Sequence, residues 1–185
     1  MLTLLIWVVI TMHPHQSGTT ANPAANAKGQ VCWPLNFAGL TVGVNDDSHV
    51  RRLLGAGVFR ADEGHTGGRY FIDEKQVATL HVVEGVDNVV EELTLMEGVA
   101  PNIKAVDRKA AITKWFNPHE QFGKWHQLHL GSTKDEVLSN LGQPQKQISQ
   151  NKWEYESTCA CELAAYLDLS FKAGRLVQVA ISEEE

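Results

Sequence analysis

The chain has 185 residues, of which 43% are hydrophobic and 21% charged, and 16 Lys and Arg stand against 22 Asp and Glu for a formal net charge of −6. This length and balance predict a globular protein of one ordinary domain or two small ones, and they exclude a disordered chain. The basic residues are scattered singly or in pairs, which argues against a nucleic-acid-binding surface, because such a surface needs clustered positive charge.

The first residues differ in character from the rest of the chain. Leu2 to Met12 is an uncharged apolar run, and a polar stretch rich in Pro and Ala follows to about Lys28. The run is too short to span a bilayer but has the length of the apolar region of a secretory signal, although no Lys or Arg precedes it. We expect residues 1–28 to be a signal peptide or disordered leader and the protein to be periplasmic or secreted, with no integral membrane span. The alternative is a buried N-terminal strand.

A first structural unit is expected over residues 31–101. In "GVNDDSHVRRLLGAG", Asn45 or Asp46 can cap a helix that carries Val50 and Leu54 at helical spacing, and glycines end it. Three runs with strand character follow, at Gly67 to Asp73, Val77 to Gly85 and Asn88 to Met96.

The same order of elements returns over residues 102–185, which we expect to form a second unit. "GSTKDEVLSNLGQP" has Ser132 or Thr133 as a helix cap with an acidic residue three positions later, then Val137 and Leu141 on one face. Strand runs follow at Asn151 to Ser157, Ala164 to Gly174 and Arg175 to Ser182. A helix of about two turns is not stable alone, so each must dock on a sheet.

These patterns predict an α+β fold: two tandem units, each a helix plus a three- or four-stranded antiparallel sheet, with the helices on one face. Between the units lie residues 102–127, where "IKAVDRKAAITKWF" has a loose helical spacing that Asn117-Pro118 ends. We expect a helix there that links the units or packs ahead of the second one.

The pattern resembles the SmpA/OmlA (BamE-like) family, and its tandem form resembles the β-lactamase-inhibitor-protein fold. The resemblance rests mainly on residues of the second unit and more faintly on the first, as follows: Gly131, Val137, Leu141, Gly142, Pro144, Trp153, Tyr155 and Gly174, then Gly43, Val50, Leu54, Gly55, Tyr70 and Phe71. It implies a fold more than a function.

Histidines and cysteines give a weaker chemical signal. His119, His126 and His129 have no spacing typical of a zinc-binding helix, and the glycines around His65 fit no phosphate loop. We therefore expect no enzyme, no metal and no cofactor. The alternative is a small secreted hydrolase or metal-binding protein that uses His65 or the cluster of His119, His126 and His129. The cysteines, Cys32, Cys159 and Cys161, allow one disulfide bridge in an oxidising compartment.

Aromatic side chains suggest a binding surface. Trp153 and Tyr155, two residues apart on one strand, share a sheet face. If helices cover the opposite face, this pair points outward; the other interpretation is that both face the core. Tyr70 holds the corresponding place in the first unit, and Arg69 and Lys152 would supply a polar rim. We therefore expect a non-catalytic module that binds another protein, and no nucleic acid, through an aromatic sheet face.

Overall fold

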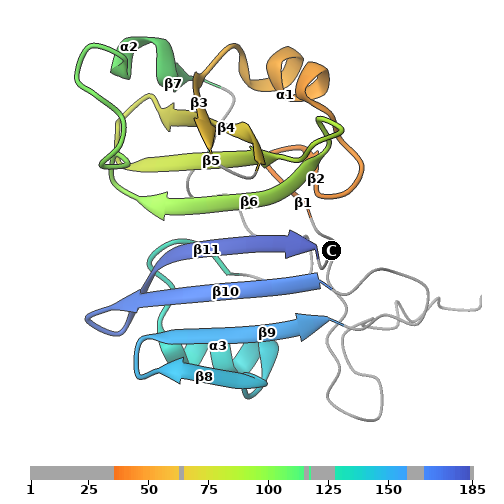
Figure 1. Cartoon of the computed structure of the whole chain (residues 1–185). Helices are drawn as coiled ribbons and strands as arrows, with labels where there is room; N and C mark the ends of the chain where they lie inside the picture. The colour runs from red at the N-terminus through yellow and green to blue at the C-terminus, as the bar shows by residue number, and fades with distance from the viewer. Residues whose placement is uncertain (1–35, 63–64, 115–116, 118–127, 158–164, 184–185) are drawn as a thin grey trace, which may run out of the picture.

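The computed structural model describes residues 36–62, 65–114, 117, 128–157 and 165–183 (Figure 1). The expected leader at 1–28, the three cysteines, His119 and His126 all lie outside the described residues. Within the described residues, no helix is long and apolar enough to cross a membrane.

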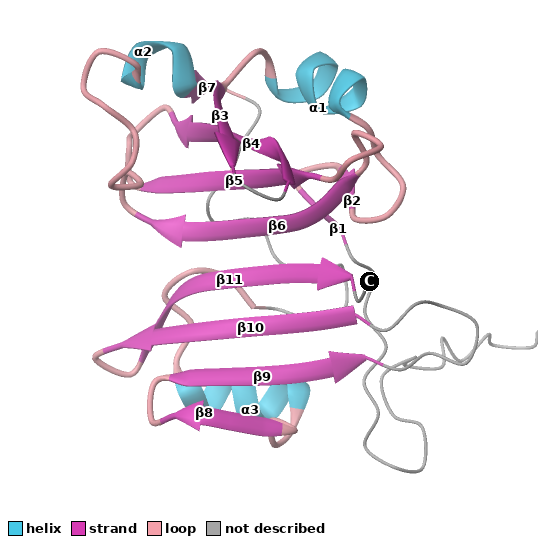
Figure 2. Cartoon of the chain, in the orientation of Figure 1, coloured by secondary structure: helices cyan, strands magenta, loops and turns pink. Residues whose placement is uncertain are grey.

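A nine-stranded sheet dominates the fold (Figure 2). Its strands are β3 (Val58–Asp62), β4 (His65–Asp73), β5 (Ala78–Glu84), β6 (Val90–Glu97), β7 (Ile112–Thr113), β8 (Lys146–Ser149), β9 (Lys152–Ser157), β10 (Ala165–Lys172) and β11 (Arg175–Glu183). The main path runs β3-β4-β5-β6-β11-β10-β9-β8 with antiparallel neighbours, and β7 pairs with β4 in parallel. A two-stranded sheet, β1 (Asn36–Phe37) and β2 (Leu40–Thr41), lies beside it.

Strands β6 and β11 join the first half of the protein, residues 36–114, to the second half, residues 128–183. They pair in register through Leu93 with Ile181 and Leu95 with Val179. All four side chains are buried and belong to one core cluster. The two halves therefore share a sheet and its core.

Two short helices are capped at their N-termini. In α1 (Asp47–Leu54), the side chain of Asp46 accepts a hydrogen bond from the backbone N–H of His49. In α3 (Lys134–Leu141), Thr133 and Glu136 form a reciprocal capping box. Capping partners of this kind satisfy backbone donors that a helix leaves open in its first turn. The third helix, α2 (Arg108–Ala111), has only four residues.

The expected α+β class is wrong, because the structure is mostly antiparallel β-sheet and its helices lie on both faces. The apolar residues of α1 and α3 join the cluster that contains Phe71 of β4. Ala111 of α2 instead joins a second cluster with Tyr70 and Ile72. Because adjacent residues of a strand point to opposite faces, α2 covers the face opposite to α1 and α3. Of the linking helix expected within 102–127, the described residues 102–114 hold only α2, after which the chain pairs with β4 as β7.

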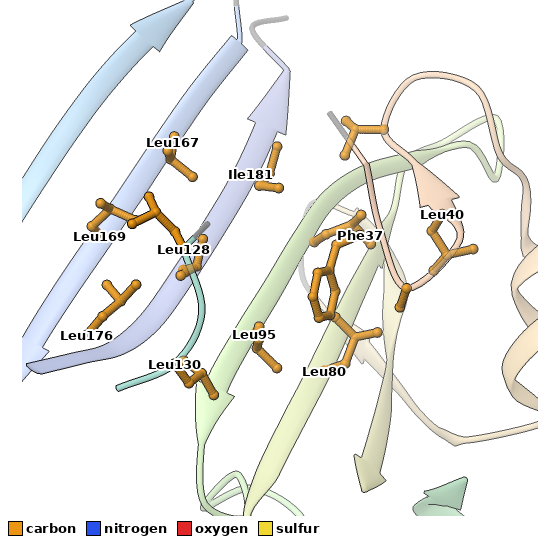
Figure 3. Packing of buried hydrophobic residues seen from close by; sticks show 14 of the residues in the cluster. Phe37, Leu40, Leu80, Leu95, Leu128, Leu130, Leu167, Leu169, Leu176 and Ile181 are labelled. Carbon is orange, nitrogen blue, oxygen red and sulfur yellow. The ribbon is translucent and has the colours of Figure 1, made fainter. Parts of the chain in front are cut away.

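The larger cluster lies under α1, α3 and the β1–β2 hairpin. Figure 3 shows leucines of β5, β6, β10 and β11 pointing to one side of the sheet, with Phe37, Leu40, Leu128 and Leu130 packed over them. Each fully buried Val, Leu, Ile or Phe side chain in such a cluster contributes about 1.5–3 kcal/mol when it leaves water. We call this side the covered face.

Candidate functional site

Trp153 and Tyr155 lie on the covered face, with relative exposures of 6% and 0%. Their partners across β10 are Leu169 and Leu167, which point the same way. The Trp153 ring packs against Phe171 at a centroid distance of 4.6 Å. The placement expected for this pair, on an open face, is therefore wrong, and the alternative that both face the core is the correct one.

A hydrogen bond satisfies the polar hydroxyl group of Tyr155 on the covered face. The hydroxyl donates this bond to the backbone carbonyl of Gly142, at 3.0 Å, where α3 ends. Burial raises the pKa of Tyr155 above its usual value. The residue thus connects β9 to the end of α3 and keeps its proton.

Arg69 also lies on the covered face rather than at a rim. Its Nε is 2.5 Å from a carboxylate oxygen of Asp47 in α1, and its Nη1 donates to the carbonyl of Ala56 at 3.0 Å. A carboxylate oxygen of Glu84 is 3.4 Å away, and the guanidinium lies over the Phe59 ring. With its side chain 14% exposed, Arg69 ties α1 to the sheet.

Glu84 is the most perturbed carboxyl of this buried group. Its side chain is 3% exposed. Burial raises its pKa to about 7, and the negative charge of Asp47 adds to the effect, while the charges of Arg69 and Arg51 oppose it. Arg69, Asp47 and Glu84 together hold α1 on the sheet, and we assign them a structural role.

The side of strands β6, β11, β10 and β9 that lies opposite to the covered face is the remaining candidate for a binding surface. Its side chains alternate with those of the core, and none belongs to either core cluster of the described residues. We call it the open face and define it by Glu92, Thr94, Gln178, Ala180, Ser182, Tyr166, Asp168, Ser170, Lys152, Glu154 and Glu156. Apart from Thr94, which is buried, and Lys152, which is exposed, these residues are half-buried.

The open face is polar and carries more acid than base. It holds four carboxylates, those of Glu92, Glu154, Glu156 and Asp168. Lys152 pairs with Asp168 at 3.2 Å, and Lys146 of β8 pairs with Glu154 at 3.3 Å. Between the carboxylates, Ala180, Ser170 and Ser182 form a floor of small side chains. Lys152 is thus the one predicted site residue that lies on this face.

Tyr70 lies on the same side of the sheet as the open face but beyond it, at the end covered by the segment around α2. It is 9% exposed, and its ring stacks on that of His81 at 4.0 Å with an interplanar angle of 9°. Both line a recess of about 220 Å³ together with Arg60, whose guanidinium is 2.5 Å from Asp107. Gly68 gives the His81 ring its room, since a Cβ there would lie 2.2 Å from Nε2.

The predicted histidine cluster is only partly described. Nδ1 of His129 lies 2.7 Å from the carbonyl oxygen of Leu130, within its own loop. His65 begins β4, and its side chain is outside the described part of the structure. In that described part, no group of three or more His, Cys, Asp and Glu residues is placed to hold a metal ion.

Comparison with known proteins adds little to this geometry. No family model matches the chain, and no curated protein matches it. Among solved structures, the chain is similar to a DUF4309 family protein (YjgB) from Bacillus subtilis, with 14% identity and a TM-score of 0.49 over 85% of this chain and 89% of that one. The resemblance to the SmpA/OmlA family stays a prediction.

Proposed function

We propose that the protein is an exported, non-catalytic module that binds another protein through the open face. The observation that carries the proposal is a patch of mostly polar and mostly half-buried side chains on four adjacent strands, none of which takes part in either described core cluster. The apolar run from Leu2 to Met12 supports export.

Charge on the open face favours a partner with a basic contact surface. Its carboxylates outnumber its lysines, and the whole chain has a net charge of −6. Complementary charge steers encounter and selects among partners. The small side chains of Ala180, Ser170 and Ser182 leave room for long Lys or Arg side chains to lie between the carboxylates.

Ala180 offers a direct test. Its side chain lies on the open face, opposite to the core residues Val179 and Ile181, so replacing it with Arg adds bulk and positive charge without filling the core. Ala110→Arg is the matched control, because Ala110 is exposed in α2. Wild type and both variants are immobilised at equal density and exposed to an envelope extract, and their melting temperatures are measured in parallel.

We expect a protein that wild type and Ala110→Arg retain and Ala180→Arg does not, with all three chains melting alike. Its contact with the open face is then mapped by crosslinking from position 180. Release of that protein by about 0.5 M salt is expected if charge contributes, because salt screens exposed charges within a few ångströms. Equal retention by Ala180→Arg of every protein that wild type retains would contradict the proposal.

A further inference from the structure

A pocket of about 460 Å³ opens where the two halves of the protein meet, at the end of the sheet formed by the β10–β11 turn. The first half contributes Val77, Ala78 and Glu97 to it, and the second half contributes Leu130, Lys172 and Leu176 among others. We call it the seam pocket. Its volume falls within the range of about 300–1,000 Å³ that is usual for small-molecule sites, which often lie between structural units.

The floor of the seam pocket is apolar and fixed. Ala78, Leu130 and Leu176 are buried, at 0%, 9% and 1% exposure, and belong to the shared core. Val77, which is 44% exposed, also lines the pocket. An apolar group bound here would cover Val77 and remove its apolar surface from water, which favours binding.

Two cations line the pocket from the β10–β11 hairpin, Lys172 and Arg175, and Nη1 of Arg175 donates to the carbonyl of Gly131 at 2.9 Å. Lys172 and Arg175 are direct partners across the β10–β11 hairpin, so their side chains leave the same face. The turn between them, Ala173 and Gly174, has positive φ at both residues, as a tight hairpin turn of this kind requires. Like charges directly opposite each other are unfavourable, and no ion pair joins either one to any described residue. An anion between them would relieve that repulsion.

Glu97 supplies the opposite charge at the end of β6. It lines the same pocket and is exposed, and it forms no ion pair with a described residue. The seam pocket thus combines a cationic side, an acidic side and an apolar floor.

From this arrangement we propose that the seam pocket binds a small zwitterion with an apolar body, the class of free apolar amino acids and short apolar peptides. The carboxylate of the ligand lies toward Lys172 and Arg175, its ammonium group toward Glu97, and its apolar part on Leu176 and Val77. This proposal is independent of the open face, since none of these residues belongs to it.

Titration of the full chain with four probes tests the assignment, by calorimetry and by NMR chemical shifts. Leucine and leucyl-leucine carry both charges, N-acetyl-leucine lacks the ammonium group, and leucinamide lacks the carboxylate. We expect saturable binding of leucine or leucyl-leucine below about 1 mM, which corresponds to about 4 kcal/mol. The tighter of the two identifies a free amino acid or a peptide as the source.

Charge-neutralising variants assign the two ends of the ligand. Lys172→Gln should weaken leucine and N-acetyl-leucine by about tenfold, the usual loss for one hydrogen bond to a charged group. Glu97→Gln should weaken leucine and leave N-acetyl-leucine unchanged. Lys104→Gln, at an exposed lysine outside the pocket, is the control and should bind like wild type. Absence of saturable binding of every probe, or wild-type affinity in both Lys172→Gln and Glu97→Gln, would overturn the proposal.

Discussion

The buried carboxyl of Glu84 is the residue through which pH acts most directly on the described fold. Its pKa is raised to about 7 from a usual value of 4.5, mainly by burial and then by the charge of Asp47. A carboxyl whose pKa is raised in the folded state favours folding below its unfolded pKa, and that contribution is lost as pH rises through the folded pKa. The relevant window is therefore about pH 4.5 to 7.

Replacing Glu84 with Gln should remove this pH dependence. Between pH 5 and pH 8, the free energy of unfolding of the variant should rise relative to that of wild type by roughly 2–3 kcal/mol, since one pKa unit corresponds to about 1.4 kcal/mol. Urea denaturation at both pH values measures the difference. Glu74→Gln, at a side chain that is 57% exposed, should shift little and serves as the control. A constant difference between Glu84→Gln and wild type would contradict the assigned pKa.

A substitution of Trp153 tests the packing of the core, because its side chain is buried on the covered face. Its side chain packs on Phe171, and the ammonium group of Lys134 lies 5.4 Å from its ring. Trp153→Ala should lower the free energy of unfolding by about 3–5 kcal/mol, the usual cost of removing a buried aromatic side chain. Lys152→Ala, one position away on the open face, should cost at most about 1 kcal/mol through its ion pair with Asp168. Similar losses in the two variants would contradict the burial of Trp153.

At the scale of the elements, α1 and α3 are attached to the sheet in the same way. The N–H of Gly43 donates to the carbonyl of Val90, whose own N–H donates to Asn45. Gly131, Leu176 and Ser132 repeat this pair of bonds in the second half. The segment before each helix is thus bonded to a strand of the sheet, which helps to explain why an eight-residue helix persists.

The cap of α3 should carry a measurable part of its stability. The side chain of Thr133 accepts a bond from the N–H of Glu136, and the carboxylate of Glu136 accepts one from the N–H of Thr133 at 2.6 Å. These bonds to Thr133 hold the pKa of Glu136 below its usual value. Thr133→Ala should cost about 1 kcal/mol in thermal or urea unfolding, and Thr133→Ser should cost little. Equal losses for Ala and Ser would mean that the hydroxyl bond contributes nothing.

Local patterns predicted elements better than their arrangement. The strand runs expected from alternation begin and end within two residues of β4, β5, β6, β9, β10 and β11. The sequence of β8 shows no apolar alternation, because all four of its residues are exposed. This edge strand is held by its backbone pairing with β9. The face of Trp153 and Tyr155 was assigned wrongly. Leu167 and Leu169 of β10 mark the buried side of the sheet, but only the cross-strand register shows that they are the neighbours of Tyr155 and Trp153. No local signal shows that α2 covers the opposite face.

At the scale of the whole molecule, the central pairing of β6 with β11 joins the two halves into one sheet over one core. Five residue pairs join the strands, and the core beneath them contains side chains from both halves. The register of this junction depends on contacts between residues far apart in sequence. The local repeats that predicted two units therefore gave no information about it.

Leu95→Ala tests whether the two halves unfold cooperatively. Leu95 is fully buried in β6 and faces Val179 across the junction, so the substitution should cost about 2–5 kcal/mol. If the halves unfold together, amide protons of β10 in the second half should lose as much protection free energy as those of β5 in the first. Native-state hydrogen exchange measures both strands in one experiment. Phe59→Ala, at a side chain 42% exposed in the edge strand β3, is the control and should change both strands far less. Unchanged protection of β10 in Leu95→Ala, with β5 weakened, would mean that the sheet is continuous in hydrogen bonding but that its halves unfold separately.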